Sequence, residues 1–284
     1  MTLEQLSTFI AVAEREHLTQ GADALGLSPS AASTAIKALE AYYDVRLFDR
    51  VGRRIELTRE GRVLLAEARL TLAQIRHTES VLSELGSLRT GILDVQASQT
   101  VANYWLPQRL LAFHSQFPGV TINFEAGNTD AVAQAVVEGR AELGFVEGDV
   151  DEPVLASTPV VRDRLVAVTA ATVRAELGDL RWIMREPGSG TRAVFEAAMA
   201  AAGYEPAALQ VALVLPTNEA VLSAVRAGTA AAALSEMVVA PFITSGELQV
   251  LEIDLPPRQF SILRHRERRL SAAAARFEAL CRER

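Results

Sequence analysis

The segment SPSAASTAIKAL, residues 28–39, constrains the fold of this chain more than any other feature. Ser28 has the side chain of a helix N-cap, and Pro29 takes the first helical position, where its missing N–H costs no hydrogen bond. A short helical pattern precedes the segment and ends at Gly26. Two short helices joined by a tight turn predict a helix-turn-helix, whose second helix enters the major groove of DNA.

The second helix of this motif has one apolar and one polar face. Ala32, Ile36 and Leu39 recur at i, i+4 and i+7 and are expected to face inward. The residues expected to face double-stranded DNA are Ser30, Ser33, Thr34 and Lys37. Only the lysine among them reaches a guanine, so we expect few strong base contacts, with DNA shape supplying part of the specificity.

A hairpin with an arginine-rich tip is predicted next. VRLFDR and RRIEL flank the turn residue Gly52, and Arg53 and Arg54 lie where a wing contacts phosphate or the minor groove. Residues 46–62 have a local net charge of +3, in contrast to −7 for the whole chain. A solvated arginine-rich face is the alternative interpretation.

A long helix follows and is expected to form a homodimer. Its apolar residues recur at a spacing of three to four, which is typical of a two-helix seam. They are Leu65, Ala68, Leu72, Ile75, Leu82 and Leu85. The alternative is that this helix packs on its own domain.

From residue 92 onward, strand and helix patterns alternate, which predicts an α/β fold with parallel sheets and helices on both faces. We therefore expect a winged helix-turn-helix domain at residues 1–58, a linker helix at 59–88 and an α/β domain at 89–284. The last divides into one subdomain of about 91–160 with 267–284 and a second of about 161–266. A ligand is expected in the cleft between them.

Two strand-to-helix junctions of the α/β domain are candidate ligand contacts. The first holds Ser98, Gln99 and Thr100, and the second is the segment REPGSGTR with Ser189, Gly190, Thr191 and Arg192. Helix N-termini present free N–H groups, so two of them facing one cleft favour an anion. The alternative is that these serines only cap helices.

Four further residues are expected to line the same cleft. They head helices or end strands, and are Asn128, Thr129, Glu147 and Thr217. Among them, Glu147 opposes an anion unless it meets an amine or a hydroxyl group. A neutral or amine ligand therefore stays open as an alternative.

Composition argues against several classes of protein. Cys281 is the single cysteine, so no intrachain disulfide forms, and the four histidines share no metal-ligand spacing with it. No apolar run reaches the length of a membrane span, and the N-terminus does not resemble a signal peptide, so we expect a cytoplasmic protein. We expect no cofactor and no catalytic pair. An enzyme, a cysteine-based peroxide sensor and a stand-alone solute-binding protein are the less favoured alternatives.

The chain resembles the LysR-type transcriptional regulators. The residues that carry the resemblance are LEQLSTFIAVAE, HLTQGADALGLSPSAASTAIKALE, VRLFDR and IELTREG in the first third, and TGILDVQAS, FHSQFPGV, GRAELGFVEG and REPGSGTR in the remainder. The position of Pro29 is commonly glutamine in the family. The resemblance implies a winged helix-turn-helix and an effector domain of the periplasmic-binding-protein kind.

The resemblance also implies a homotetramer that binds promoter DNA and responds to a small molecule. Members with a segment similar to PGSGTR include regulators of sulfur and carbon assimilation. The expected effector is therefore a sulfur oxyanion, a carboxylate or a phosphorylated metabolite.

Overall fold

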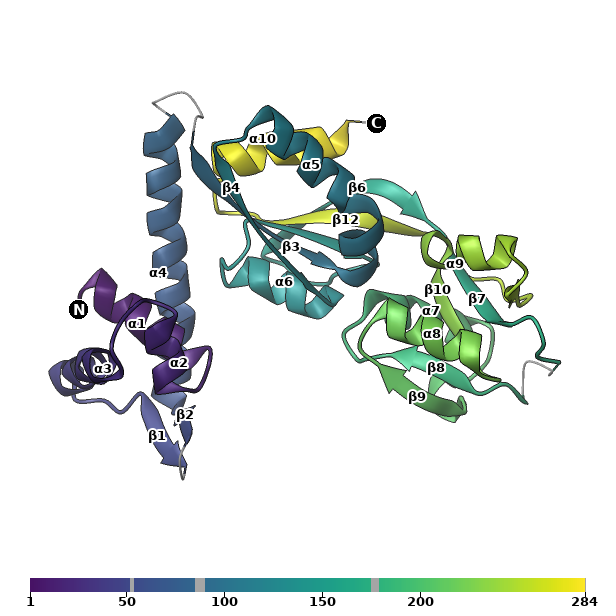
Figure 1. The fold of residues 1–284 in the computed structure, drawn as a ribbon, viewed down its shortest axis with the longest axis horizontal. Helices are drawn as coiled ribbons and strands as arrows, with labels where there is room; N and C mark the ends of the chain where they lie inside the picture. The colour runs from purple at the N-terminus through teal and green to yellow at the C-terminus, as the bar shows by residue number, and fades with distance from the viewer. Residues whose placement is uncertain (52–53, 85–89, 175–178, 284) are drawn as a thin grey trace. The chain divides into compact units, whose positions relative to one another are not determined.

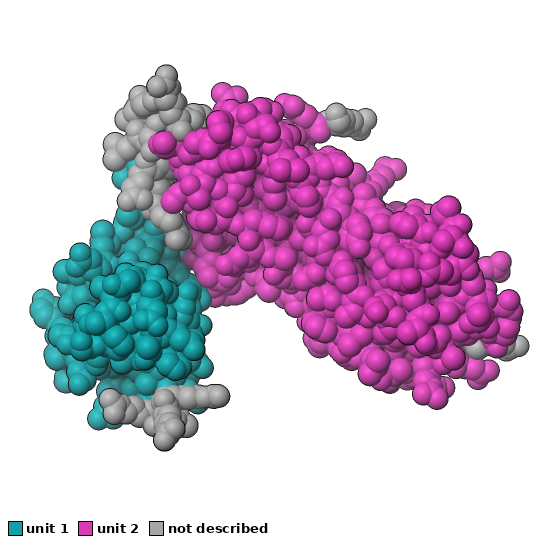
Figure 2. Space-filling model, viewed as in Figure 1, with its two compact units in different colours: residues 1–79 teal, residues 80–284 magenta. Residues whose placement is uncertain are grey.

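The computed structural model describes residues 1–51, 54–84, 90–174 and 179–283. The chain divides into two compact units, Met1–Glu79 and Ser80–Arg284, each of which is described by itself (Figure 2).

Unit 1 contains three helices, a two-stranded hairpin and most of a long fourth helix (Figure 1). Its elements are α1 (Leu3–Ala13), α2 (Leu18–Asp23), α3 (Pro29–Tyr43), β1 (Phe48–Val51), β2 (Arg54–Leu57) and α4 (Arg59–Glu84). Gly26 adopts a φ of +65° in the turn between α2 and α3, a conformation that glycine enters without steric cost. Ser28 caps α3 by accepting a hydrogen bond from the Ala31 N–H at 3.2 Å. The predicted helix-turn-helix and hairpin are therefore present.

The first part of α4 packs on its own domain. Leu65 and Ala68 are 9% and 1% exposed and lie in one apolar cluster with Phe9 and Leu39. These two residues were expected to begin a dimer seam, and that expectation is wrong for them because they complete the core of unit 1. Leu85 lies outside the described residues, as does the side chain of Leu82.

Unit 2 contains two five-stranded mixed sheets, and the first is covered on both faces. Its strand order is β4 (Val120–Gly127), β3 (Gly91–Ser98), β5 (Leu143–Glu147), β12 (Arg258–His265) and β6 (Leu155–Asp163). A π-helix η1 (Val101–Trp105), α5 (Leu106–Gln116) and α10 (Ala272–Arg282) pack on one face, and α6 (Thr129–Val137) packs on the other (Figure 1).

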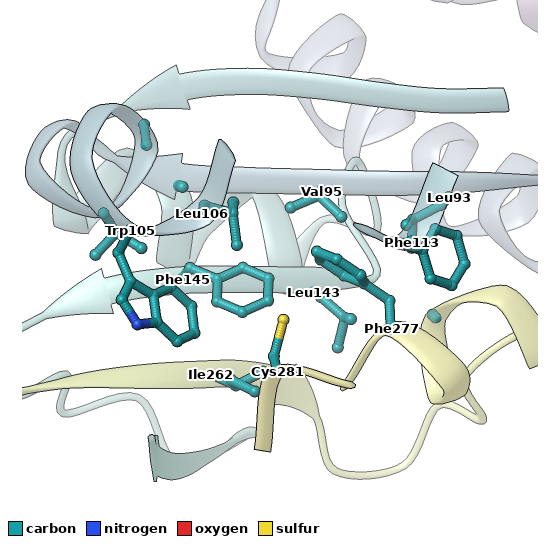
Figure 3. Packing of buried hydrophobic residues seen from close by; sticks show 14 of the residues in the cluster. Leu93, Val95, Trp105, Leu106, Phe113, Leu143, Phe145, Ile262, Phe277 and Cys281 are labelled. Atoms are coloured by element: carbon teal, nitrogen blue, oxygen red, sulfur yellow. The ribbon is translucent and has the colours of Figure 1, made fainter. Parts of the chain in front are cut away.

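Aromatic side chains fill the core under α5 and α10 (Figure 3). Phe277 packs edge-to-face on Phe113 and Phe145, with ring centroids 5.2 and 5.8 Å apart. Cys281 is buried in the same cluster. Its sulfur therefore belongs to the packed interior of the first sheet.

The second sheet of unit 2 has the order β11 (Leu248–Val250), β7 (Leu165–Ala170), β10 (Ala231–Ser235), β8 (Trp182–Arg185) and β9 (Val211–Leu215). Its helices are α7 (Gly190–Ala201), α8 (Asn218–Ala227) and α9 (Glu236–Thr244), with a short 3₁₀ turn η3 (Pro206–Ala208). α7 packs on one face of this sheet, and α8 and α9 pack on the other.

The sequence expectation of parallel sheets is wrong in part. β12 runs antiparallel to both β5 and β6, and β10 and β11 run antiparallel to β7. β12 and the end of β6 belong to the first sheet, although the expected boundaries placed 161–163 and 258–266 in the second subdomain. From here on, the first subdomain means residues 91–163 with 258–283, and the second means 164–257.

Candidate functional site

The polar face of α3 is the candidate DNA-contact surface. Ser30, Thr34 and Lys37 are exposed and Ser33 is half-buried, while Ala32, Ile36 and Leu39 are buried as expected. The polar residues lie on the side of α3 away from the core of unit 1. These side chains are therefore not needed to complete the core of unit 1.

Two of these hydroxyls already have local partners. The Thr34 hydroxyl donates to the Ser30 carbonyl at 2.9 Å, and the Ser30 hydroxyl lies 3.0 Å from the Ser28 hydroxyl. Thr34 therefore presents its methyl group and acceptor lone pairs, which leaves Lys37 as the strongest donor on this face. Lys37 is also the only lysine in the sequence.

The predicted wing contacts are not described. Arg53 lies outside the described residues, and for Arg54 the structure describes only its place at the start of β2.

The candidate effector site is a buried polar cluster centred on Glu147, at the end of β5. Ser98 and Thr100 donate their hydroxyls to its two carboxylate oxygens, Thr100 at 3.2 Å, and Thr191 donates at 3.4 Å. Asn218 donates its amide to Thr100 at 3.0 Å. All five residues are at most 1% exposed, and they are called the Glu147 cluster below.

The Glu147 cluster joins the two subdomains. Ser98, Thr100 and Glu147 come from the first, whereas Thr191 begins α7 and Asn218 begins α8 in the second. A second link is formed at Glu219, which accepts hydrogen bonds from Asn103 and Tyr104 at 2.9 and 3.3 Å. Partial burial, followed by the charge and hydrogen bond of Glu219, raises the pKa of Tyr104 above its usual value.

An arginine–carboxylate pair lies at each end of the network that passes through Glu147. Arg185 donates to Asn218 and pairs with Glu186 at 2.8 Å. At the other end, Arg258 donates to the Thr191 hydroxyl at 2.8 Å and pairs with Asp163 at 2.6 Å. Asp163 also accepts a hydrogen bond from the Ser235 hydroxyl at 2.7 Å.

Close packing of backbone brings α7 against β5. A side chain at Gly190 would overlap the Glu147 carbonyl oxygen and come within 2.6 Å of the Thr129 hydroxyl. Thr129 itself donates to that carbonyl at 3.2 Å. Asn128 caps α6 through Ala131 and donates its amide to the Pro187 carbonyl at 3.3 Å. Glycine is therefore required at position 190 for the two subdomains to meet in this way.

Two buried polar atoms of the site have no hydrogen-bond partner within the described residues. They are the Ser189 hydroxyl oxygen and Nη2 of Arg258, in residues that are 2% and 4% exposed. Ser189 precedes α7 but does not cap it, and the Arg258 guanidinium lies against the first turn of α7 through its bond to Thr191. Buried polar atoms are normally satisfied, so these two mark a place for a further group.

Some predicted contacts are engaged elsewhere. Arg192 pairs with Glu196 at 2.8 Å and donates to the Arg185 carbonyl at 3.1 Å. Thr217 is half-buried and caps α8 by accepting from the Ala220 N–H at 3.1 Å, and Gln99 is half-buried with no bond to the Glu147 cluster. Thr217 therefore serves as the N-cap of α8.

Sequence reasoning missed five members of the network. They are Asp163, Arg185, Asn218, Ser235 and Arg258. Each lies at a strand end or at the first residue of a helix, beside apolar runs such as LVAVTA and FSILRH. For Asp163, Arg185 and Arg258, the available signal was a charge at the end of a strand with buried residues, because such a charge needs a partner.

Two kinds of site receive no support from the described part of the chain. No group of three histidine, cysteine or carboxylate residues there could hold a metal ion. None of the helices described has both the length and the apolar character to cross a membrane.

Burial raises the pKa of the Cys281 thiol from 9.0 to about 12, which disfavours the reactive thiolate.

Comparison with known proteins places both units in one family. Residues 3–62 match the bacterial regulatory helix-turn-helix protein, lysR family, and residues 86–284 match the LysR substrate binding domain. The HTH-type transcriptional regulator YeiE of Escherichia coli K12 is 33% identical over 99% of this chain and 97% of its own length. CbbR of Rhodospirillum rubrum is 31% identical over 90% of this chain and 87% of its own length.

Solved structures agree in fold. Full-length CbnR in complex with its target DNA matches with a TM-score of 0.69 and 23% identity, covering 99% of both chains. The regulatory domain of Synechocystis CcmR in complex with 2-PG matches with a TM-score of 0.60 and 23% identity, covering 68% of this chain and 96% of that domain. The relatives are regulators, not enzymes, and this chain belongs to the LysR-type transcriptional regulators.

Proposed function

We propose that this regulator binds promoter DNA through α3 and that a small anionic effector, held at the start of α7, modulates this binding. The observation that carries the DNA part is the exposed polar face of α3 within a matched helix-turn-helix. Lys37 contacts base edges, and the hydroxyl residues contact phosphates or thymine methyl groups. Arg53 and Arg54 contact the DNA backbone beside it, and the protein works in the cytoplasm.

The effector part rests on the two unpartnered buried atoms, Ser189 Oγ and Arg258 Nη2. Both are donors beside the N-terminus of α7, a twelve-residue helix whose first N–H groups and dipole favour negative charge. A carboxylate, sulfur oxyanion or phosphate group would satisfy both donors. Because the site is buried, the effector enters when the two subdomains separate. Once bound, it holds the subdomains in one relative orientation. Gln99, Asn128 and Thr217 would lie near its path.

The protein is proposed to act as a homodimer through the later part of α4, and as a homotetramer through further contacts of unit 2. The first turns of α4 serve the core of unit 1, and half-buried Leu72 packs against the same core, so the seam would begin near Ile75. A two-fold dimer would present two α3 helices to a partly palindromic DNA site.

A gel-shift assay with the DNA directly upstream of its own gene tests the DNA proposal. The full chain should bind with a strong salt dependence, and deletion of residues 1–90 should abolish binding. Equal retention of a scrambled sequence of the same length would contradict promoter recognition.

A thermal-shift screen of the full chain tests the effector proposal. Sulfate, sulfite, phosphate, small carboxylates and phosphorylated sugars are the probes, because a ligand of the native state raises Tm. Thr100→Ala should remove the response but spare DNA binding, since Thr100 belongs to unit 2. If no compound of any class shifts Tm or alters the gel shift, the effector site itself is refuted.

A neutral or amine effector is the second candidate, and Glu147 favours it. Its carboxylate accepts the hydroxyls of Ser98, Thr100 and Thr191, which were expected to bind an anion. A simple anion would therefore meet a negative charge at this end of the site.

A further inference from the structure

We infer that the effector is a zwitterion, whose ammonium group binds Glu147 and whose carboxylate binds Ser189 and Arg258. The inference rests on the proposed effector site and names the chemical class of its ligand. It follows from two observations on opposite sides of Thr191. On one side the Glu147 carboxylate lacks a cationic partner among the described residues, and on the other two buried donors lack an acceptor.

The first observation is that the Glu147 carboxylate has no cationic partner among the described residues. Its side chain is buried, and it accepts hydrogen bonds from three neutral hydroxyls but forms no ion pair with any described residue. The arginines of the network are already paired with other carboxylates: Arg185 with Glu186, Arg192 with Glu196 and Arg258 with Asp163. A buried charge without a counter-charge is costly, so a cationic ligand group is favoured here.

The carboxylate of Glu147 also has room in its hydrogen bonding. A carboxylate offers roughly four lone-pair sites, and the three hydroxyls fill three of them. The bond from Thr191 is long, at 3.4 Å, and it crosses between the subdomains. An ammonium group, with three N–H donors, can take the free site and replace Thr191 when the subdomains part.

The second observation is that Ser189 Oγ and Arg258 Nη2 have no hydrogen-bond acceptor among the described residues. Both atoms can donate and neither has a partner among the described residues, and the guanidinium of Arg258 is held beside α7 by its bond to Thr191. A carboxylate can accept from both at once. Phosphate and sulfate can do the same, but neither supplies the cation that Glu147 lacks.

The groups proposed to bind the ammonium and the carboxylate come from different elements of unit 2. The acceptor for the ammonium is built from β3 and β5 of the first subdomain. The donors for the carboxylate come from the start of α7 and from Arg258, the first residue of the returning strand β12. Because Arg258 belongs to the first subdomain and Ser189 to the second, the carboxylate spans the two subdomains, and the ammonium group adds a further contact on the first subdomain that a simple anion lacks. Effector binding can therefore change how the two subdomains lie relative to each other.

The test uses matched probes on the full chain. Tm is measured with the proteinogenic amino acids and, for each one that binds, with its des-amino acid and its decarboxylated amine. We expect each truncation to weaken binding by roughly tenfold or more, because either charged group of the site is then left unpaired. Sulfate, phosphate and propionate serve as simple anions.

Glu147→Gln gives a result of opposite sign for the two ligand classes. It should weaken amino-acid binding by roughly tenfold or more and strengthen sulfate or propionate binding, because it removes a negative charge. Glu125→Gln, on the exposed edge strand β4, is the matched control and should change neither. If Glu147→Gln does not fold, the probe series on the unchanged protein decides the question.

The inference is overturned if simple anions or plain amines bind as tightly as the matching amino acid, or if Glu147→Gln leaves amino-acid binding unchanged. Binding of simple anions alone would leave the proposed function in place and refute the zwitterion. A complete lack of response to all three classes would refute the proposed effector site as well.

Discussion

Arg258 and Asp163 form an ion pair of 2.6 Å between Nε and Oδ2 at the point where the chain crosses between the two sheets of unit 2. Asp163 ends β6 just before β7 begins, and Arg258 opens β12 after β11. The ion pair therefore links the two chain segments that pass between the sheets. The two side chains are 1% and 2% exposed. Arg258 also contacts Thr191, so the crossing is linked to the Glu147 cluster.

Asp163→Ala should lower the free energy of unfolding by about 3–5 kcal/mol, because it leaves the Arg258 guanidinium buried without its counter-charge. Glu236→Ala is the control, since its pair with Arg164 at 3.4 Å is largely exposed and should contribute about 0–1 kcal/mol. Denaturant unfolding of both variants measures the difference. Equal losses would show that the crossing pair is no more important than a surface pair.

Ser189→Ala and Ser271→Ala should differ although both serines are buried and both precede helices. The Ser271 hydroxyl caps α10 by accepting from the Ala274 N–H at 3.1 Å and donates to Glu142 at 2.9 Å, so its loss should cost about 1–2 kcal/mol. The Ser189 hydroxyl has no partner in the described structure, so its loss should cost less than about 0.5 kcal/mol.

The same Ser189→Ala variant should nevertheless weaken effector binding, which separates the two serines by function. Thermal unfolding with and without the ligand found in the screen measures both effects. A stability loss at Ser189 equal to that at Ser271 would assign it an ordinary structural role.

Gly190→Ala should destabilise unit 2 by about 1–3 kcal/mol through overpacking, because the added methyl group overlaps the Glu147 carbonyl. Gly91→Ala is the control: its added methyl group meets nothing within 4 Å, so the change should stay within about 0.5 kcal/mol. Calorimetry of both variants tests whether α7 and β5 meet as closely as described. A neutral Gly190→Ala variant would show that they do not.

Local patterns predicted the elements well, because they depend on neighbours in the sequence. The cap at Ser28, the turn at Gly26 and the inward face of α3 all involve residues a few positions apart. The returning strand β12 could not be placed in this way. Its pairing with β5 and β6 is fixed by topology, and the same apolar pattern suits either sheet.

The sequence predicted which residues of the candidate site lie together, but not how they bond to one another. Ser98, Thr100, Thr191 and Glu147 were all expected near one ligand, and they do come together. Their hydroxyls donate to Glu147 itself, which the sequence does not reveal, because the partners are 44–49 positions apart. Arg258 and Asp163 are 95 positions apart and escaped notice for the same reason.

Cys281 should be unreactive in the folded protein. Burial is the largest cause of its raised pKa, about 12 against 9.0, while Arg109 opposes the shift. The unfolded chain releases the proton near pH 9 and the folded chain holds it, so this contribution to stability is complete below about pH 9 and is lost between about pH 9 and 12.

Labelling with a disulfide reagent at pH 8 should therefore be slower in the native protein than in guanidinium by on the order of a thousandfold or more, since the thiolate is the nucleophile. Equal labelling rates would contradict the burial of Cys281 and reopen a thiol-based signal.

Lys37 should carry the strongest base contact of α3. Lys37→Ala is expected to weaken binding to the promoter site by about 1–3 kcal/mol and to relax its specificity, whereas Lys37→Arg should keep much of both, because either side chain can donate to guanine. Because Lys37 is the only lysine, an amine-reactive reagent labels it alone besides the N-terminus. Bound promoter DNA should protect Lys37 from labelling, as measured by peptide mass spectrometry, while scrambled DNA at the same salt protects it less. Unchanged labelling in the presence of saturating promoter DNA would place α3 outside the DNA groove.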